Sequence, residues 1–243
     1  DLSGRFGLTP KSEIGVLLEE PGFEPYERDD GIHPDKMVQA KPKLTYNAWL
    51  REKGYEGENP WHEYANSAEG PSGETLSGWS LRNSNLPARV AEEHSETAYM
   101  TDRAIEFIDE TGDKPWLLHL SYIKPHWPYM APVPYHDMFG PEHFLPVNRS
   151  PEEQDKVHPV YRAFMEMGVS QTFSEPGVRE TVLPAYMGLI RQIDDHLGRL
   201  FAALEERDLM DNTMIVFTSD HGDYLGDHWM GEKELFHDCS MRI

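Results

Sequence analysis

The chain has 243 residues, of which 38% are hydrophobic and 27% charged, with a mean hydropathy of -0.64. No apolar run approaches the ~20 residues that would span a membrane, and 43 acidic against 22 basic residues give a formal charge of -21. A surface this acidic excludes the basic footprint that nucleic-acid binding requires. We therefore expect a globular chain whose partners include neither nucleic acid nor a membrane.

The number of cysteines bears on the cellular compartment of the protein. Cys239 is the single cysteine, so no disulfide forms within the chain. We expect a cytoplasmic protein. Because the sequence begins at Asp1, a signal peptide upstream of it stays open, and so does a periplasmic location. We expect Cys239 to be a buried structural thiol.

Residues 1–89 are rich in Pro and Gly with charged residues between them, a composition typical of loops. Two patches are more regular: Glu13 to Leu18 fits a strand or a helical turn, and Lys43 to Lys53 fits a short helix carrying Trp49 and Leu50. Aromatic residues throughout argue against plain disorder. We predict an insertion that covers the core and shapes the entrance of a ligand site, with simple loop packing as the alternative.

Residues 90–243 predict part of an α/β core. Apolar residues at helical spacing, with Gly112 as a stop, predict a helix over residues 90–111. The run from Trp116 to Tyr122 then predicts a buried strand, with His119 as a core histidine. The helix-to-strand order is that of a doubly wound α/β sheet.

The predicted strand is followed by Lys124 and His126, and ligands gather at the carboxyl ends of strands in such sheets. Pro125 and Pro128 fix φ and stiffen the loop that holds His126. His126 is therefore a candidate catalytic residue. Lys124 is a candidate substrate contact, and a solvent-facing lysine is the alternative.

Two further helices are expected after a Pro-rich loop region, a short one at Tyr161 to Met167 and a long one over residues 180–207. Pro184 lies in the first turns of the long helix, where proline is better tolerated. Its apolar residues form a continuous stripe: Leu183, Tyr186, Met187, Ile190, Ile193, Leu197, Leu200, Phe201 and Leu204.

The run from Thr213 to Thr218 is short, apolar and β-branched, and predicts a second buried strand. Asp220 and His221 follow at its carboxyl end. A carboxylate beside an imidazole is a ligand pair for a divalent metal ion, so we assign Asp220 and His221 to a metal site. Lys233 lies one loop further on and is a candidate for neutralising charge on an anionic substrate.

These motifs resemble those of one enzyme family. The run T-S-D-H-G-D-x-L-G-D-H-x-x-x-x-K from Thr218 to Lys233 is similar to the C-terminal signature of the sulfatase branch of the alkaline phosphatase superfamily, and K-P-H-x-P-Y from Lys124 to Tyr129 is similar to another sulfatase segment. The resemblance implies a doubly wound, mostly parallel sheet with helices on both faces and long loop insertions. Residues 90–243 would be part of that catalytic core, incomplete at both ends.

The resemblance also implies a metal-dependent hydrolase of sulfate or phosphonate and phosphate esters that uses one divalent ion, Ca²⁺ or Mn²⁺, and a formylglycine nucleophile. Its substrate would be a small anionic ester, and a homo-oligomer stays open. His221, where many sulfatases have Asn, resembles phosphonate monoester hydrolases and favours phosphonate or phosphodiester substrates.

The family's C/S-x-P-x-R nucleophile motif and its early Asp-Asp metal pair are absent from the sequence. We therefore expect the nucleophile outside this chain and an isolated chain that is inactive. Three alternatives stay open. One is a phosphodiesterase or nucleotide pyrophosphatase with a Thr or Ser nucleophile. The others are a non-catalytic homologue that binds a metal or an anion, and an acidic interaction protein with no such site.

Overall fold

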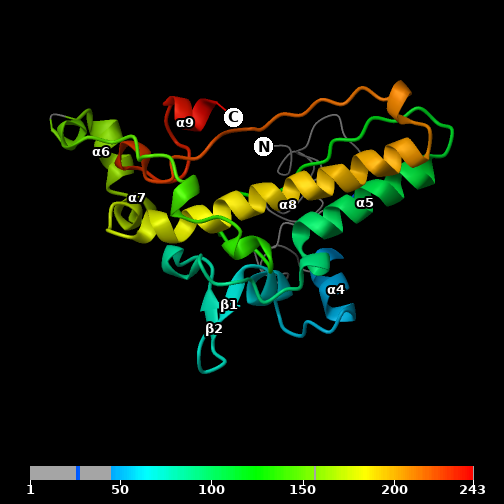
Figure 1. Ribbon diagram of the computed structural model, residues 1–243, viewed down its shortest axis with the longest axis horizontal. Helices are drawn as coiled ribbons and strands as arrows, with labels where there is room; N and C mark the ends of the chain where they lie inside the picture. The colour runs from blue at the N-terminus through cyan, green and yellow to red at the C-terminus, as the bar shows by residue number, and fades with distance from the viewer. Residues whose placement is uncertain (1–25, 28–44, 156, 243) are drawn as a thin grey trace, which may run out of the picture.

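The computed structural model describes residues 26–27, 45–155 and 157–242. Two long helices dominate it, α5 (Glu96–Thr111) and α8 (Val178–Glu206), and they lie side by side (Figure 1). The predicted patch at Glu13 to Leu18 lies outside the described residues. None of the helices in the described ranges is long and apolar enough to cross a membrane.

The two helices run parallel and are joined by polar contacts about two turns apart: Gln192 with Ser95 (2.8 Å), Arg199 with Asp102 (2.6 Å) and Arg207 with Asp109 (2.6 Å). The first of these contacts is buried, and the other two are on the surface, where ion pairs contribute little to stability. The register of the helix pair is therefore set at the amino end of α5.

Local sequence signals explain α5. The Ser95 hydroxyl accepts a hydrogen bond from the Ala98 amide (3.2 Å) and so caps the first turn. The helix ends before Gly112, whose φ of +55° lies in the left-handed region that glycine adopts without strain. The helix predicted over residues 90–111 is confirmed as α5, although α5 begins only at Glu96.

The predicted helix over residues 180–207 is confirmed as α8, with Pro184 in its second turn. Its buried face differs from the predicted stripe, because Ile190 is 46% exposed. Polar residues take its place: Gln192 is buried against Ser95, and the Nε2 of buried His196 lies 2.7 Å from a Glu92 carboxylate oxygen. Hydrogen bonds to the start of α5 thus set the rotation of α8, and the apolar stripe alone does not.

The segment before α5 forms a small unit below the helix pair (Figure 1). It contains α4 (Thr45–Glu52), a π-helical turn η1 (Trp61–Ala65), β1 (Ser67–Glu69) and β2 (Thr75–Ser77). Tyr46, Leu50, Trp61, Tyr99 and Met130 belong to its core cluster. The short helix predicted at Lys43 to Lys53 is confirmed as α4, and the described residues between α4 and α5 are more regular than predicted.

The remaining elements are short and lie in the connections: η2 (Leu81–Asn83), η3 (Glu92–His94), η4 (Tyr135–Asp137), η5 (Pro141–His143), η6 (Pro151–Gln154), α6 (Pro159–Met165), α7 (Gly168–Phe173), η7 (Met210–Asn212), η8 (Asp227–Trp229) and α9 (Asp238–Met241). The helix predicted at Tyr161 to Met167 corresponds to α6.

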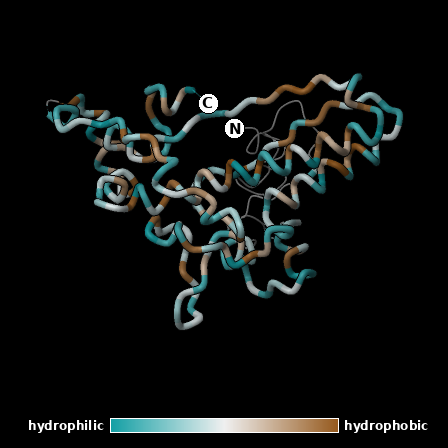
Figure 2. The backbone as a smooth tube through the Cα atoms, viewed as in Figure 1, coloured by the Kyte–Doolittle hydropathy of each residue, from teal (hydrophilic) through white to brown (hydrophobic). Residues whose placement is uncertain are grey.

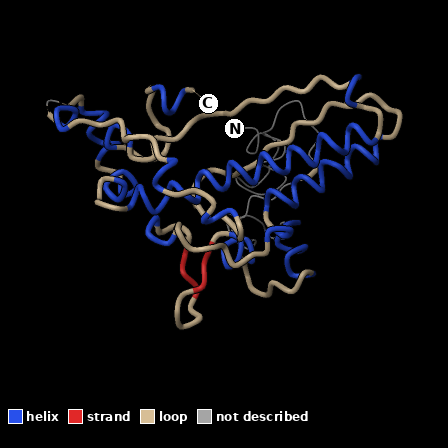
Figure 3. The backbone as a smooth tube through the Cα atoms, in the orientation of Figure 1, coloured by secondary structure: helices blue, strands red, loops and turns tan. Residues whose placement is uncertain are grey.

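The predicted doubly wound parallel sheet is not seen among the described residues. Their one sheet is the antiparallel pair of β1 and β2, in which Ser67 lies opposite Ser77. The segments predicted as buried strands, Trp116 to Tyr122 and Thr213 to Thr218, are loops in Figure 3. A strand needs a neighbour to pair its backbone groups, and no backbone hydrogen bond joins either segment to another strand of the described chain.

These two segments are also exposed. Leu117 is 78% exposed, Met214 88% and Phe217 74%, and the second segment is a hydrophobic stretch on the outside of the fold in Figure 2. His119, predicted in the core, is exposed as well. The apolar pattern of both segments would be buried only under neighbouring strands.

Candidate active site

His126 lies in the loop between the extended segment from Trp116 to Tyr122 and the buried residue Tyr129. Its Nδ1 is 2.7 Å from the carbonyl oxygen of Trp127, and a carbonyl only accepts, so Nδ1 carries the proton. The Nε2 is therefore the acceptor. The Nζ of Lys233, 107 residues further along the chain, donates a hydrogen bond to it.

His221 has the same arrangement as His126. Its Nδ1 donates to the carbonyl oxygen of Gly222 (2.7 Å), which leaves the Nε2 lone pair available. The rings of His126 and His221 meet edge to face with their centroids 5.8 Å apart. The structure thus brings together His126, His221 and Lys233, which the sequence predicted from three separate stretches.

Gly222 fixes the position of the His221 loop. Its N–H donates to the carbonyl oxygen of Ser240 (2.7 Å), and a Cβ at this position would lie 2.1 Å from the carbonyl oxygen of Cys239. Only glycine allows this approach, so the loop lies directly against α9. The pKa of the Cys239 thiol is raised to about 11 by burial, which argues against a nucleophilic role.

Asp220 and His221 have the donor set of half a metal site. The Asp220 carboxylate oxygen lies 3.5 Å from His221 Nε2, and its side chain is 85% exposed. Oxygen and nitrogen donors this close can bind one divalent ion, and a histidine whose Nδ1 bonds a carbonyl has the usual orientation of a metal ligand. No group of three possible ligands is present among the described residues, so the two would need further ligands to complete the site.

Asp223, two residues after His221, has a partly buried carboxyl group. Asp223 accepts hydrogen bonds from the Tyr129 hydroxyl (2.5 Å) and the Leu225 amide (3.0 Å). Loss of water around the carboxyl raises the pKa of Asp223 to about 6, with a further contribution from the Glu232 carboxylate. Tyr129 is fully buried, and its own pKa is raised well above its ordinary value by that burial and by Asp223.

Glu232 is a residue of this cluster that the sequence did not indicate. Its carboxylate lies 3.4 Å from Lys233 Nζ and 3.8 Å from His126 Nε2. In the sequence it is one of many glutamates, and its place beside the predicted Lys233 was the one signal available.

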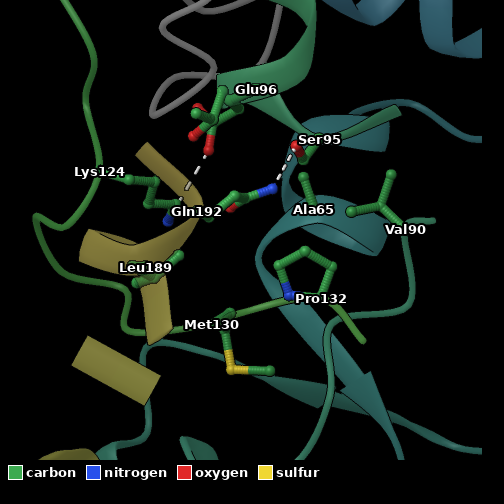
Figure 4. Close-up of a pocket in the computed structure, with 10 residues that line it drawn as sticks. Ala65, Val90, Ser95, Glu96, Lys124, Met130, Pro132, Leu189 and Gln192 are labelled. Carbon is green, nitrogen blue, oxygen red and sulfur yellow. Dashed lines mark hydrogen bonds and ion pairs between the residues drawn. The ribbon is translucent and has the colours of Figure 1, made fainter. Parts of the chain in front are cut away.

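Lys124 has a different position from the other predicted residues. Its Nζ is buried and donates to the Asn66 side-chain oxygen (2.5 Å) and the Pro128 carbonyl oxygen (2.8 Å), with Glu96 at 3.7 Å. Figure 4 shows it beside a cavity of about 10 Å³, which holds about one water molecule. This ammonium group joins α5 to the His126 loop, and its predicted substrate contact stays a prediction.

The chain is similar to several known proteins. The sulfatase family model matches residues 31–238. The multifunctional alkaline phosphatase superfamily protein PehA of Trinickia caryophylli is 36% identical over 170 residues, which cover 65% of this chain and 33% of that protein. An arylsulfatase of Clostridium perfringens is 30% identical over 148 residues, covering 60% of this chain and 30% of that enzyme.

The structural comparison covers more of the chain. The phosphonate monoester hydrolase of Silicibacter pomeroyi matches with a TM-score of 0.73 and 26% identity, over 90% of this chain and 42% of that one. The chain thus spans about a third of the length of these curated relatives and about two fifths of the solved structure.

Proposed function

The chain belongs to the sulfatase family, and from this premise we propose that it supplies part of the active site of a hydrolase of sulfate or phosphonate esters. The observation that carries the proposal is the contact between Lys233 and His126, with His221 beside them. A cation, an imidazole and a metal-ligand pair at one point suit displacement at a sulfuryl or phosphoryl centre.

Each residue has a role in this proposal. The Lys233 ammonium binds a non-bridging oxygen of the ester and neutralises charge that develops there. His126 offers Nε2 to the leaving oxygen and, when protonated there, donates its proton to it, since the Trp127 carbonyl fixes the other ring nitrogen. Asp220 and His221 would hold a divalent ion, Ca²⁺ or Mn²⁺, which supplies polarisation of the ester when bound.

The nucleophile and the substrate are finer points of the proposal. A formylglycine outside the described residues is the expected nucleophile, as the family resemblance implies. The likeness to phosphonate monoester hydrolases, together with His221, favours phosphonate monoesters or phosphodiesters over sulfate esters.

The test is hydrolysis of 4-nitrophenyl phenylphosphonate and 4-nitrophenyl sulfate by protein expressed from its full open reading frame, with Mn²⁺ or Ca²⁺ added. We expect His126→Ala and Lys233→Ala each to lower kcat by about 10²- to 10³-fold, because each removes a group that acts on the transition state. His143→Ala and Lys114→Ala are matched controls, since both side chains are exposed and outside the cluster. Wild-type protein that hydrolyses neither ester, or catalytic variants as active as the controls, would refute the proposal.

A further inference from the structure

Among the residues that the structure describes, Glu232 is the one carboxylate that contacts both proposed catalytic groups. It lies 3.4 Å from Lys233 Nζ and 3.8 Å from His126 Nε2, and its side chain is only 13% exposed. A carboxylate in this position lowers the affinity of the site for anions, although the proposed substrate is itself an anion. Its presence therefore needs a reason.

The backbone conformation of Glu232 is also unusual. Glu232 has a φ of +64°, in the left-handed region that disfavours every residue with a Cβ. The Tyr224 N–H donates to the Glu232 carbonyl oxygen (2.9 Å) and holds the backbone in place. Strained residues of this kind gather at functional sites, where the surrounding structure maintains them.

The charges around Lys233 give the reason. An ester oxygen bound to the Lys233 ammonium comes close to the Glu232 carboxylate, because that carboxylate already contacts the same ammonium. At Lys233, a singly charged ester then meets an ammonium group whose charge is balanced by the Glu232 carboxylate. A doubly charged ester brings a second negative charge into the same space and meets correspondingly stronger repulsion.

We propose that Glu232 is a specificity-determining residue that selects singly charged esters, such as phosphonate monoesters, phosphodiesters and sulfate esters, over doubly charged phosphate monoesters. This inference rests on the proposed function, since it concerns the charge of the substrate at the same site. It does not require Glu232 to take part in the chemical step.

The experiment compares two substrates that share a leaving group, 4-nitrophenyl phenylphosphonate with one charge and 4-nitrophenyl phosphate with two at pH 8.5. We expect Glu232→Gln to shift the ratio of the two kcat/KM values about tenfold towards the phosphate, since a unit charge nearby is removed. Glu234→Gln makes the same change of charge two residues away on an exposed side chain and should leave the ratio unchanged. An equal loss on both substrates would show a purely structural role and overturn the inference.

A binding measurement separates this inference from the proposed function. Isothermal titration with inorganic sulfate, a dianion, and methanesulfonate, a monoanion, needs no turnover. We expect Glu232→Gln to tighten sulfate binding about tenfold more than methanesulfonate binding. Wild-type protein that hydrolyses no ester would refute the proposed function alone, whereas an equal change for both anions would refute the role of Glu232.

Discussion

At the scale of single residues, Asp223 links the site to the stability of the protein. Its pKa of about 6 lies above the ordinary value of 3.8, so the folded state binds this proton more tightly than the unfolded state does. The resulting stabilisation is complete below pH 4 and is lost as the pH rises through 6. Two pKa units correspond to at most about 3 kcal/mol.

In the wild type, this loss lowers the free energy of unfolding by about 2 kcal/mol between pH 4.5 and pH 7.5, and we expect Asp223→Asn to abolish that decrease. Urea unfolding at both pH values, with EDTA present to keep the neighbouring Asp220 and His221 free of metal, measures the difference. Asp238→Asn is the control, because that side chain is 79% exposed on α9. If Asp223→Asn and Asp238→Asn show the same pH dependence, the Asp223 carboxyl is not perturbed as described.

The residues of the candidate site differ in how far sequence could place them. His126, His221 and Lys233 follow recognisable motifs, and their mutual contacts agree with that expectation. Glu232 could not be placed, because neither its positive φ nor its contact with His126 follows from its neighbours in the chain. Lys124 sits in a motif too, yet its burial against Glu96 and Asn66 depends on segments 28 and 58 residues away.

At the scale of elements, one hydroxyl both caps α5 and makes its buried polar contact with α8. Ser95 Oγ accepts from the Ala98 amide and from Gln192 Nε2 at the same time. We expect Ser95→Ala to lower the free energy of unfolding by about 1 to 2 kcal/mol, since it removes the helix cap and a buried hydrogen bond. Thermal or urea unfolding measures the change.

The control for this helix cap is Ser72→Ala. Ser72 lies exposed in the turn between β1 and β2, and we expect a change within about 0.5 kcal/mol. If Ser95→Ala is no more destabilising than Ser72→Ala, the hydroxyl does not set the helix pair.

The helices were predictable and the strands were not, for a physical reason. The stop signal of α5 and the long apolar stripe of α8 are local features of the sequence. The burial of Trp116 to Tyr122 and Thr213 to Thr218 depends on other strands lying beside them, and the described residues supply none. An apolar, β-branched run indicates an extended segment, but its partners are a property of the tertiary structure.

At the scale of the whole molecule, the formal charge of -21 opposes the approach of an anionic ester. The cluster near Lys233 attracts the ester only at short range, whereas the acidic surface acts over the Debye length of about 10 Å at 0.1 M salt. Added salt screens the long-range repulsion first. The proposed activity should therefore depend on ionic strength in the direction opposite to that of an enzyme with a cationic surface.

We expect kcat/KM for 4-nitrophenyl phenylphosphonate to rise about two- to fivefold between 10 and 150 mM NaCl, with kcat unchanged, because only the encounter is affected. Replacing the exposed Glu205 and Glu206 at the end of α8 by Lys changes the formal charge from -21 to -17, since each replacement adds two charges. This variant should have a higher kcat/KM at 10 mM NaCl and a flatter salt dependence. A kcat/KM that falls with added salt would show instead that the local cations around Lys233 dominate the encounter, and that the acidic surface lies too far away to matter.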